Sequence, residues 1–181
     1  MSKIFVVENY FQQKEYNLIC QNVLQLDFTP PPIENRKAVE KSAQLAGLGD
    51  GGAYWFQEKI PSESDVAVAC YNSLKPKFFF TRPKVIQDIY YTIVSSQKQF
   101  APHVDRGGEY QVLIYLMGNE TVNNGTGFYK PDAEGNLVLN THIGFQQNRA
   151  ILFTKDNYHA PLLWAGNSSM RYSICFSFDL E

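Results

Sequence analysis

A histidine and an aspartate stand two positions apart in the segment Pro-His-Val-Asp-Arg, as His103 and Asp105. In a β-strand, alternate side chains leave the same face, so these two side chains would project together while Val104 points the other way. An imidazole and a carboxylate side by side are two adjacent ligands for a divalent metal ion. His159, on a later apolar segment, is the third ligand that the pattern predicts. Two histidines and one carboxylate on one side of a metal form the facial triad that suits Fe(II) and leaves coordination positions open.

A basic residue in the last apolar segment adds a second chemical requirement. Arg171 and Ser173 share one face of a strand by its two-residue period. An arginine that points into an apolar barrel needs an anionic partner, because an unpaired buried guanidinium is costly. Its planar fork matches a carboxylate through two parallel hydrogen bonds. The triad and Arg171 together predict a co-substrate that presents a carboxylate at one end and chelates the metal at the other.

The elements that must position these residues are short, β-prone segments that recur after residue 97, with turn-forming sequences between them. Regularly spaced short strands of this kind are typical of a sandwich or a barrel. The strands that we expect cover residues 99–104, 110–117, 127–129, 137–140, 150–154, 159–164 and 171–178.

The first half of the chain has a more helical pattern. We expect a strand over residues 4–7, then a helix that Asn9 caps and that ends before Thr29, because the prolines that follow cannot continue it. Residues 33–48 allow a further helix, residues 53–60 and 65–71 are expected to be strands, and residues 85–94 are expected to be a helix. A helical N-terminal half would cover one sheet of the barrel and hide the edge of that sheet. The expected architecture is a single domain over residues 1–181, in which residues 1–97 support a β-rich core of residues 98–181 that carries the metal site.

Composition argues against several classes of partner. The net charge is −2 and the basic residues are scattered, so the chain lacks the basic patch of a nucleic-acid-binding protein. The three cysteines lie far apart without CxxC spacing, which predicts reduced thiols in an intracellular protein. No signal segment and no apolar run of about 20 residues occurs, so we expect a cytoplasmic protein with no membrane partner. The pattern carries no signal for an oligomeric state.

The order His-x-Asp, distant His, then Arg resembles that of the Fe(II)- and 2-oxoglutarate-dependent dioxygenases, above all their prolyl-hydroxylase-like branch. In that branch the aspartate precedes a Gly-rich turn and a strand ending in Tyr-Leu, similar to Val112-Leu113-Ile114-Tyr115-Leu116. Its last strand is of Arg-Tyr-x-Ile type, similar to Arg171-Tyr172-Ser173-Ile174. Its Gly-Gly-x-x-x-Phe stretch is represented by Gly125-Thr126-Gly127-Phe128-Tyr129, in which Thr126 interrupts the glycine pair. The resemblance covers residues 99–179.

The resemblance implies an α+β, mainly β fold whose core is a double-stranded β-helix, or jelly roll. It implies Fe(II), with 2-oxoglutarate and O2 as co-substrates, and release of succinate and CO2. Because halogenating relatives replace the triad carboxylate with a small residue, Asp105 favours hydroxylation, here of a small-molecule or peptidyl substrate. Two groups of side chains would form the site, namely the metal ligands His103, Asp105 and His159 and the 2-oxoglutarate-binding residues Arg171, Tyr115 and Ser173.

Alternatives remain open on the residues alone. A zinc hydrolase could use the same triad to activate water, which would leave Arg171 without a co-substrate to bind. A jelly-roll binding or structural protein could keep the triad as a vestige or as a structural ion site. His142 is the alternative third ligand, although its polar-edged segment predicts a solvated side chain. Tyr115 could equally be a packed core residue.

Overall fold

The computed structural model describes residues 3–26, 53–78, 83–96, 101–118, 120, 124–162 and 171–180. The elements in these ranges, in chain order, are β1 (Ile4–Val7), α1 (Gln13–Val23), β2 (Ala53–Lys59), α3 (Asp65–Phe78), β3 (Pro83–Ser96), β4 (Tyr110–Met117), β5 (Gly125–Pro131), β6 (Leu137–Gly144), β7 (Ala150–Thr154), β8 (Tyr158–Leu162) and β9 (Arg171–Leu180). The expectations for residues 33–48, 99–100 and 163–164 lie outside the described residues.

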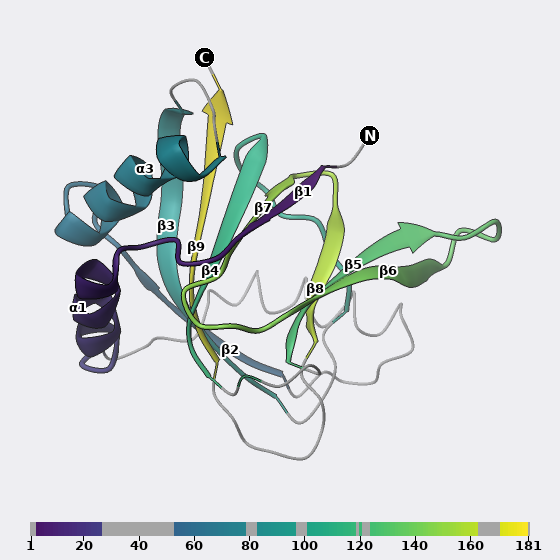
Figure 1. Ribbon diagram of the computed structural model, residues 1–181. Coiled ribbons are helices and arrows are strands. Elements are labelled where there is room, and N and C mark those ends of the chain that lie inside the picture. The colour runs from purple at the N-terminus through teal and green to yellow at the C-terminus, as the bar shows by residue number, and fades with distance from the viewer. Residues whose placement is uncertain are drawn as a thin grey trace.

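The strands form two antiparallel sheets that face each other (Figure 1). The large sheet has the strand order β1-β7-β4-β9-β3-β2, and the small sheet has the order β6-β5-β8. An isolated bridge between His103 and His159 continues the small sheet beyond β8. The hairpin of β5 and β6 projects beyond the rest of the barrel (Figure 1). Two facing antiparallel sheets with two helices confirm the mainly β jelly-roll class that the motifs implied.

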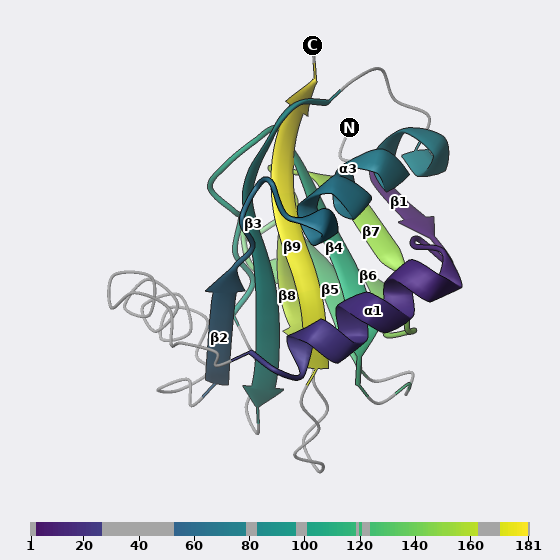
Figure 2. The same cartoon turned by 90° about the vertical axis from the view of Figure 1, so that its left-hand side faces the viewer.

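The two faces of the large sheet differ because side chains alternate along each strand. One face packs against the helices, and Figure 2 shows α1 and α3 lying across it. The strands contribute alternate apolar residues to this packing, and the helices contribute residues at three- and four-residue spacing. The buried residues there include Val112, Ile114 and Leu116 of β4, Ile174, Phe176 and Phe178 of β9, Tyr16, Ile19 and Val23 of α1, and Ala67, Cys70 and Leu74 of α3.

The other face of the large sheet, called the inner face below, points toward the small sheet. A second buried cluster lies between the two sheets and consists of Tyr115, Phe128, Phe145, Ile151 and Phe153. This cluster fills the side of the barrel near β4 and β7. On β9 the inner-facing positions are polar instead, which leaves the functional residues of that strand between the sheets.

Two predicted elements have the opposite type. Residues 85–94 were expected to be helical but lie in β3, which pairs with β9 on one side and β2 on the other. The apolar spacing there fits a helix, yet the segment is rich in β-branched and aromatic residues, which favour strands. Residues 65–71 were expected to be a strand but begin α3. Ser64 explains this start, because its hydroxyl accepts a hydrogen bond from the backbone N–H of Ala67 at 3.2 Å.

Smaller corrections concern element boundaries. Asn9 does not cap α1; it has a left-handed φ of 52°, and the helix begins four residues later with Gln12 at its N-cap. Residues 101–104 form no strand apart from the bridge at His103. The N-terminal half also does more than cover the barrel with helices, because it supplies β1, β2 and β3 to the large sheet. Neither described helix is both long enough and apolar enough to cross a membrane.

Candidate metal centre

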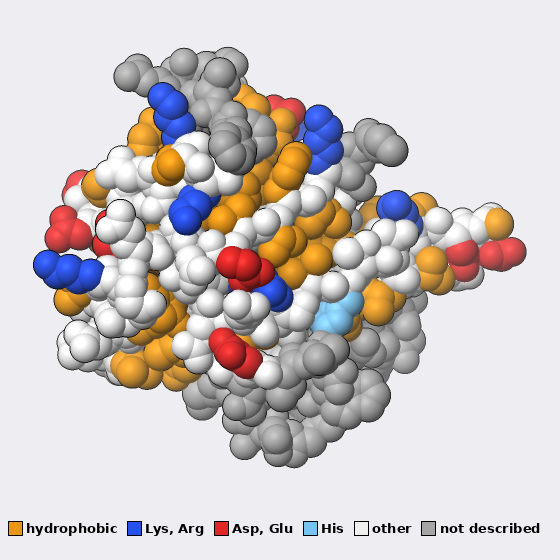
Figure 3. All heavy atoms as spheres, viewed as in Figure 1, with side chains coloured by type: hydrophobic (Ala, Val, Ile, Leu, Met, Phe, Trp, Pro, Cys, Tyr) orange, Lys and Arg blue, Asp and Glu red, His pale blue; other side chains and the backbone are white. Residues whose placement is uncertain are grey.

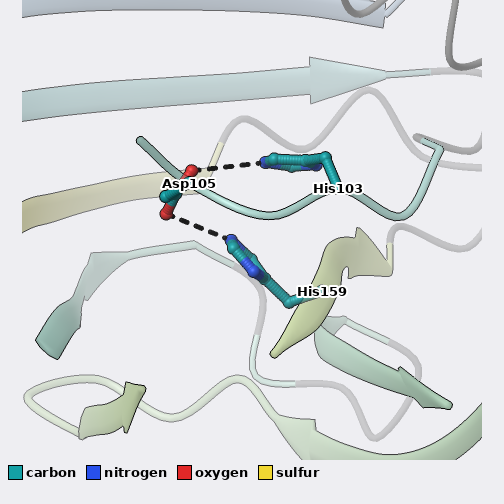
Figure 4. A group of neighbouring side chains, drawn as sticks. All are labelled: His103, Asp105 and His159. Atoms are coloured by element: carbon teal, nitrogen blue, oxygen red, sulfur yellow. Dashed lines mark ion pairs between the residues drawn. The ribbon is translucent and has the colours of Figure 1, made fainter. Parts of the chain in front are cut away.

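His103 and His159 are direct backbone partners although they lie far apart in the sequence. The N–H of His103 donates to the carbonyl of His159 at 3.0 Å, and the N–H of His159 donates to the carbonyl of His103 at 2.9 Å. The two imidazoles therefore rise side by side, with ring centroids 4.6 Å apart. Asp105 lies two residues after His103 and turns its carboxylate toward both rings (Figure 4).

The three side chains converge at distances that suit a metal ion. Nε2 of His103 lies 3.6 Å from Oδ1 of Asp105, and Nε2 of His159 lies 3.4 Å from Oδ2 of the same carboxylate. One ligand atom from each residue lies within 4.8 Å of the others. Ligands about 2.1 Å from an ion and roughly 90–110° apart are separated by about 3–3.5 Å. Small side-chain rotations would therefore bring all three onto one ion.

Backbone carbonyls orient both imidazoles. Nδ1 of His103 lies 3.2 Å from the carbonyl oxygen of Ala101, and Nδ1 of His159 lies 3.0 Å from that of Asn157. A carbonyl only accepts hydrogen bonds, so both Nδ1 atoms carry the proton when the rings are neutral. Each Nε2 lone pair then faces Asp105. This arrangement fixes the tautomer and ring orientation that a metal-ligating histidine requires.

The electrostatics of the cluster keep the metal-binding forms available. Burial lowers the pKa of His103, and the neighbouring His159 lowers it further, so this ring is held neutral. Burial raises the pKa of Asp105, but the hydrogen bond and charge of His159 outweigh it, and the net pKa is lowered. For His159, burial lowers the pKa and the Asp105 carboxylate raises it by more. The cluster therefore offers an ionised carboxylate beside two imidazoles.

One side of the triad is closed and the other is open. The side chain of His159 is 10% exposed, whereas those of His103 and Asp105 are 35% and 38% exposed. Aromatic rings close the inner side, since the ring centroid of His159 lies 4.7 Å from that of Phe153 and 6.2 Å from that of Phe128. A metal ion held here would keep coordination positions on the exposed side.

Arg171, the first residue of β9, is buried on the inner face without a matching anion. It is 2% exposed, and Nη1 donates to the carbonyl of Gly125. Its guanidinium carbon lies 5.2 Å from the ring centroid of Tyr115. Nε of Arg171 and Oγ of Ser173 are both buried and have no hydrogen-bond partner within the described parts of the chain. Among the described residues no carboxylate pairs with this guanidinium, so the pocket presents a cation and a hydroxyl with unused hydrogen-bonding capacity.

Tyr115 lies beside Arg171, and its hydroxyl meets a residue that the sequence analysis did not place in the site. The Tyr115 hydroxyl is 2.7 Å from Oγ1 of Thr126 and 3.4 Å from the carbonyl oxygen of Ile143. Tyr115 is fully buried and Thr126 is 1% exposed. Along β5, Thr126 and Phe128 face inward, which follows from their contacts across the barrel. In the sequence, Thr126 was noticeable only because it interrupts the glycine pair. That interruption indicated a poorer match to the family motif and did not indicate a role in the site.

His142 takes no part in the triad. It lies on β6 opposite Gly127, outside the group of residues whose ligand atoms converge. The predicted solvation holds only for part of the side chain, because His142 is half-buried and its Nε2 is buried with no hydrogen-bond partner among the residues that the structure describes. Burial lowers the pKa of this ring, and the charge of Arg171 lowers it further.

A strip of side chains connects the arginine end of the pocket to the triad. Along the inner face of β9, Arg171 and Ser173 are buried and Cys175 is half-buried. The partner strand β4 follows the same gradient, with buried Tyr115 opposite Ser173 and half-buried Leu113 opposite Cys175. Burial raises the pKa of Cys175 to about 12, and the charges of Asp105 and Arg171 both act on this thiol. The inner face of β9 is thus more deeply buried at Arg171 and Ser173 than at Cys175.

Comparisons with known proteins place the fold. No protein-family model matches the sequence, and no curated protein matches it. Solved structures do match. The chain is similar to a prolyl hydroxylase from Trichoplax adhaerens, in complex with a hypoxia inducible factor oxygen degradation domain peptide fragment. The identity is 16% over 97% of this chain and 82% of that chain, with a TM-score of 0.65.

Two further structures share the architecture. HygX from Streptomyces hygroscopicus, with nickel and 2-oxoglutarate bound, is 11% identical over 96% of this chain and 81% of that chain, with a TM-score of 0.60. SnoN, a non-heme alpha ketoglutarate dependent epimerase from nogalamycin biosynthesis, is 9% identical over 96% of this chain and 74% of that chain, with a TM-score of 0.62. The chain therefore has the double-stranded β-helix fold of the Fe(II)- and 2-oxoglutarate-dependent oxygenases, and it carries a His-Asp-His triad.

Proposed function

We propose that this protein is an Fe(II)- and 2-oxoglutarate-dependent dioxygenase that hydroxylates a small-molecule or peptidyl substrate. The observation that carries the proposal is the guanidinium of Arg171, buried on the same inner face that leads to the triad and unpaired by any described carboxylate. Burying such a cation costs several kcal/mol unless an anion joins it. A dicarboxylate that enters the pocket would supply that anion.

The donor set fits iron. His103, Asp105 and His159 would hold Fe(II) through two imidazole nitrogens and one carboxylate oxygen, the facial arrangement typical of non-heme oxygenases. When bound, the metal supplies the activation of O2 that couples oxidation of 2-oxoglutarate to succinate and CO2 with oxidation of the substrate. The protein supplies the geometry, because the carbonyls of Ala101 and Asn157 orient the two rings.

The pocket fits 2-oxoglutarate in charge and length. Arg171, Tyr115 and Ser173 would hold its distal carboxylate, since they offer a cation and two hydroxyls in a site closed to water. Charge-assisted hydrogen bonds in such a site are stronger than those in water. From Arg171 to Cys175 the strand rises about 13 Å, and the Arg171 guanidinium lies 5.2 Å from the ring centroid of Tyr115, the residue opposite Ser173. A five-carbon acid can therefore lie between the guanidinium and the triad.

The same observation disfavours the alternatives. A zinc hydrolase needs the triad and a water molecule. Its chemistry gives no role to a buried guanidinium further along the inner face of β9. A structural ion site would also leave Arg171 and Ser173 without partners. Between oxidative outcomes, Asp105 supports hydroxylation rather than halogenation. An epimerase shares this fold, so product identification decides between hydroxylation and another oxidation.

The test measures binding before turnover. Protein purified without oxygen should bind 2-oxoglutarate only when Fe(II) or the less oxidisable Mn(II) is present, as followed by calorimetry. Arg171→Leu should weaken this binding by about 100-fold, because a buried charge-assisted pair contributes roughly 1.5–3 kcal/mol. Lys130→Gln is the control for loss of a positive charge, since Lys130 is exposed on β5.

Turnover then completes the test. Adding O2 to the Fe(II) protein should release succinate from 2-oxoglutarate, and removing the metal with a chelator should stop it. If the metal-loaded protein binds no 2-oxoglutarate, the oxygenase proposal is wrong. If it binds 2-oxoglutarate equally well without metal, the triad has another role.

A further inference from the structure

We propose that Thr126 is a positioning residue for the co-substrate and acts on it through the hydroxyl of Tyr115. The inference rests on the proposed function, and it assigns a role to the residue that interrupts the glycine pair of β5. Thr126 projects from the small sheet into the barrel and reaches Tyr115 on the large sheet at 2.7 Å.

The dipeptide Gly125–Thr126 contacts both groups that would receive the distal carboxylate. The carbonyl of Gly125 accepts a hydrogen bond from Nη1 of Arg171. The hydroxyl of Thr126 engages the hydroxyl of Tyr115. Two anchors from the large sheet are therefore held by two consecutive residues of the opposite sheet. This contact fixes the guanidinium and the phenol relative to each other.

The hydroxyls of Tyr115 and Thr126 carry two protons, and the hydrogen bond between them needs only one. Each hydroxyl carries a single proton, and the 2.7 Å contact consumes one of the two. If Thr126 donates to Tyr115, the Tyr115 proton is free for another acceptor. The carbonyl oxygen of Ile143, at 3.4 Å, is a long and weak acceptor for it. A carboxylate bound at Arg171 would be the stronger acceptor, so the Tyr115 proton would turn to it.

Thr126 would improve Tyr115 as a donor in two ways. A hydroxyl that accepts a hydrogen bond becomes a better donor, since hydrogen bonds in a chain polarise one another. The contact also holds the phenol in place in a fully buried site. Without the Thr126 hydroxyl, the Tyr115 hydroxyl would lose both this polarisation and the contact that holds it in place, so it would donate to the carboxylate less well.

The experiment compares two variants of one side chain. Thr126→Val keeps the shape and removes the hydroxyl, whereas Thr126→Ser keeps the hydroxyl and removes a methyl group. With Mn(II) as the metal, Thr126→Val should weaken 2-oxoglutarate binding by about 10-fold and Thr126→Ser by less than about 2-fold, as measured by calorimetry. Thr126→Ala should weaken 2-oxoglutarate binding as much as Thr126→Val does. If one of these two variants fails to fold, the other still tests the role of the hydroxyl.

Two further measurements separate positioning from a purely structural role. In a double-mutant cycle, Thr126→Val should cause almost no further loss in a Tyr115→Phe background, because Thr126 would act only through the Tyr115 hydroxyl, which Tyr115→Phe has already removed. Binding of 2-oxopentanoate, which has the same chain length but no distal carboxylate, should be the same in wild type and Thr126→Val. Thr141→Val is the control, since Thr141 lies on the adjacent strand β6 and its hydroxyl accepts a hydrogen bond from the exposed side chain of Asn140 at 2.9 Å.

The outcomes distinguish this inference from the proposed function. If wild-type protein with metal binds 2-oxoglutarate and Thr126→Val binds it equally well, Thr126 has no positioning role. Additive losses in the cycle, or equal losses for 2-oxopentanoate, would make the role structural and overturn the inference. If the wild type binds no 2-oxoglutarate, the proposed function fails first.

Discussion

Arg171 is a cation only 2% exposed, on a strand whose next three inner-facing side chains, Ser173, Cys175 and Ser177, are uncharged. Residue type and two-residue period were sufficient to predict its inward direction, and the same reasoning placed Ser173 beside it. The three triad residues were predictable for a similar reason, because two histidines and one aspartate are a set of side chains that binds a divalent metal ion. Thr126 could not be found this way, since its hydroxyl matters only through a contact from the opposite sheet.

A second residue-scale property is the carboxylate of Asp132 at the tip of the β5–β6 hairpin, where acidic side chains gather (Figure 3). It accepts hydrogen bonds from the backbone N–H groups of Glu134 at 3.0 Å and Asn136 at 2.7 Å. Partial loss of hydration raises the pKa of Asp132, but the hydrogen bonds from Asn136 and Glu134 lower it by more. The folded turn therefore prefers the ionised form.

This shift predicts how the hairpin tip responds to acid. Because the pKa of Asp132 is lower in the folded turn, its contribution is complete above the unfolded value of about 4 and is lost as pH falls through the lower folded value. The amide signal of Asn136, followed by NMR between neutral pH and pH 2, should move with this titration. The movement should be absent in Asp132→Asn. A titration midpoint above 4 would contradict the expected direction.

At the scale of elements, long-range contacts decided whether some segments became strands or helices, and the local sequence pattern does not contain these contacts. Residues 85–94 became a strand because β9 and β2 pair with it on both sides, and residues 65–71 became a helix because Ser64 starts it and Cys70 and Leu74 extend its buried face. Both segments are short and apolar, where periodicity fits either structure. The C-terminal strands were predictable because turns separate them at regular intervals. The bridge at His103 was not, since a single long-range pair leaves no periodic signal.

The two glycines of β5 allow a prediction at this scale. A Cβ on Gly125 would overlap the carbonyl oxygen of Ile143, whereas a Cβ on Gly127 would meet the ends of Leu139 and Leu162 at 2.8 and 2.9 Å. Backbone cannot yield as readily as a leucine tip. Gly125→Ala should therefore lower the free energy of unfolding by about 1–3 kcal/mol, and Gly127→Ala by less, in urea denaturation.

The same pair of variants also reports on the site. Gly125→Ala should weaken metal-dependent 2-oxoglutarate binding, because relieving the overlap with Ile143 would shift the backbone at position 125, whose own carbonyl is the acceptor for Arg171. Gly127→Ala should leave that binding nearly unchanged. Equal effects of the two variants on stability and on binding would show that the close approach at Gly125 has no consequence.

At the scale of the whole molecule, the site joins parts of the chain that no local element could hold together. The triad comes from the segment before β4 and from β8, and the residues proposed to bind the carboxylate come from β4 and β9. Ligands that bind only the folded barrel must therefore stabilise it as a unit. The packing of α1 and α3 lies on the opposite face of the large sheet and is independent of these ligands (Figure 2).

In thermal unfolding, the metal and 2-oxoglutarate should each raise the stability of the protein by a separate amount. Metal at about 100 times its Kd should add about 2.7 kcal/mol, or roughly 5–10 °C in Tm for a chain of this size, and 2-oxoglutarate should add a further increase. Arg171→Leu should keep the metal increment and lose the second. His159→Ala should lose both. A 2-oxoglutarate increment that survives in His159→Ala would place its binding away from the triad.

The reciprocal backbone hydrogen bonds of His103 and His159 have one more consequence. Because each histidine secures the main chain of the other, the pair stays in register whether or not an ion sits between them. Loading iron then demands a turn of side chains rather than any refolding of the barrel. A chelated sample should accordingly regain its metal within the time of mixing, and the protein can pass through cycles of depletion and resupply with its architecture intact.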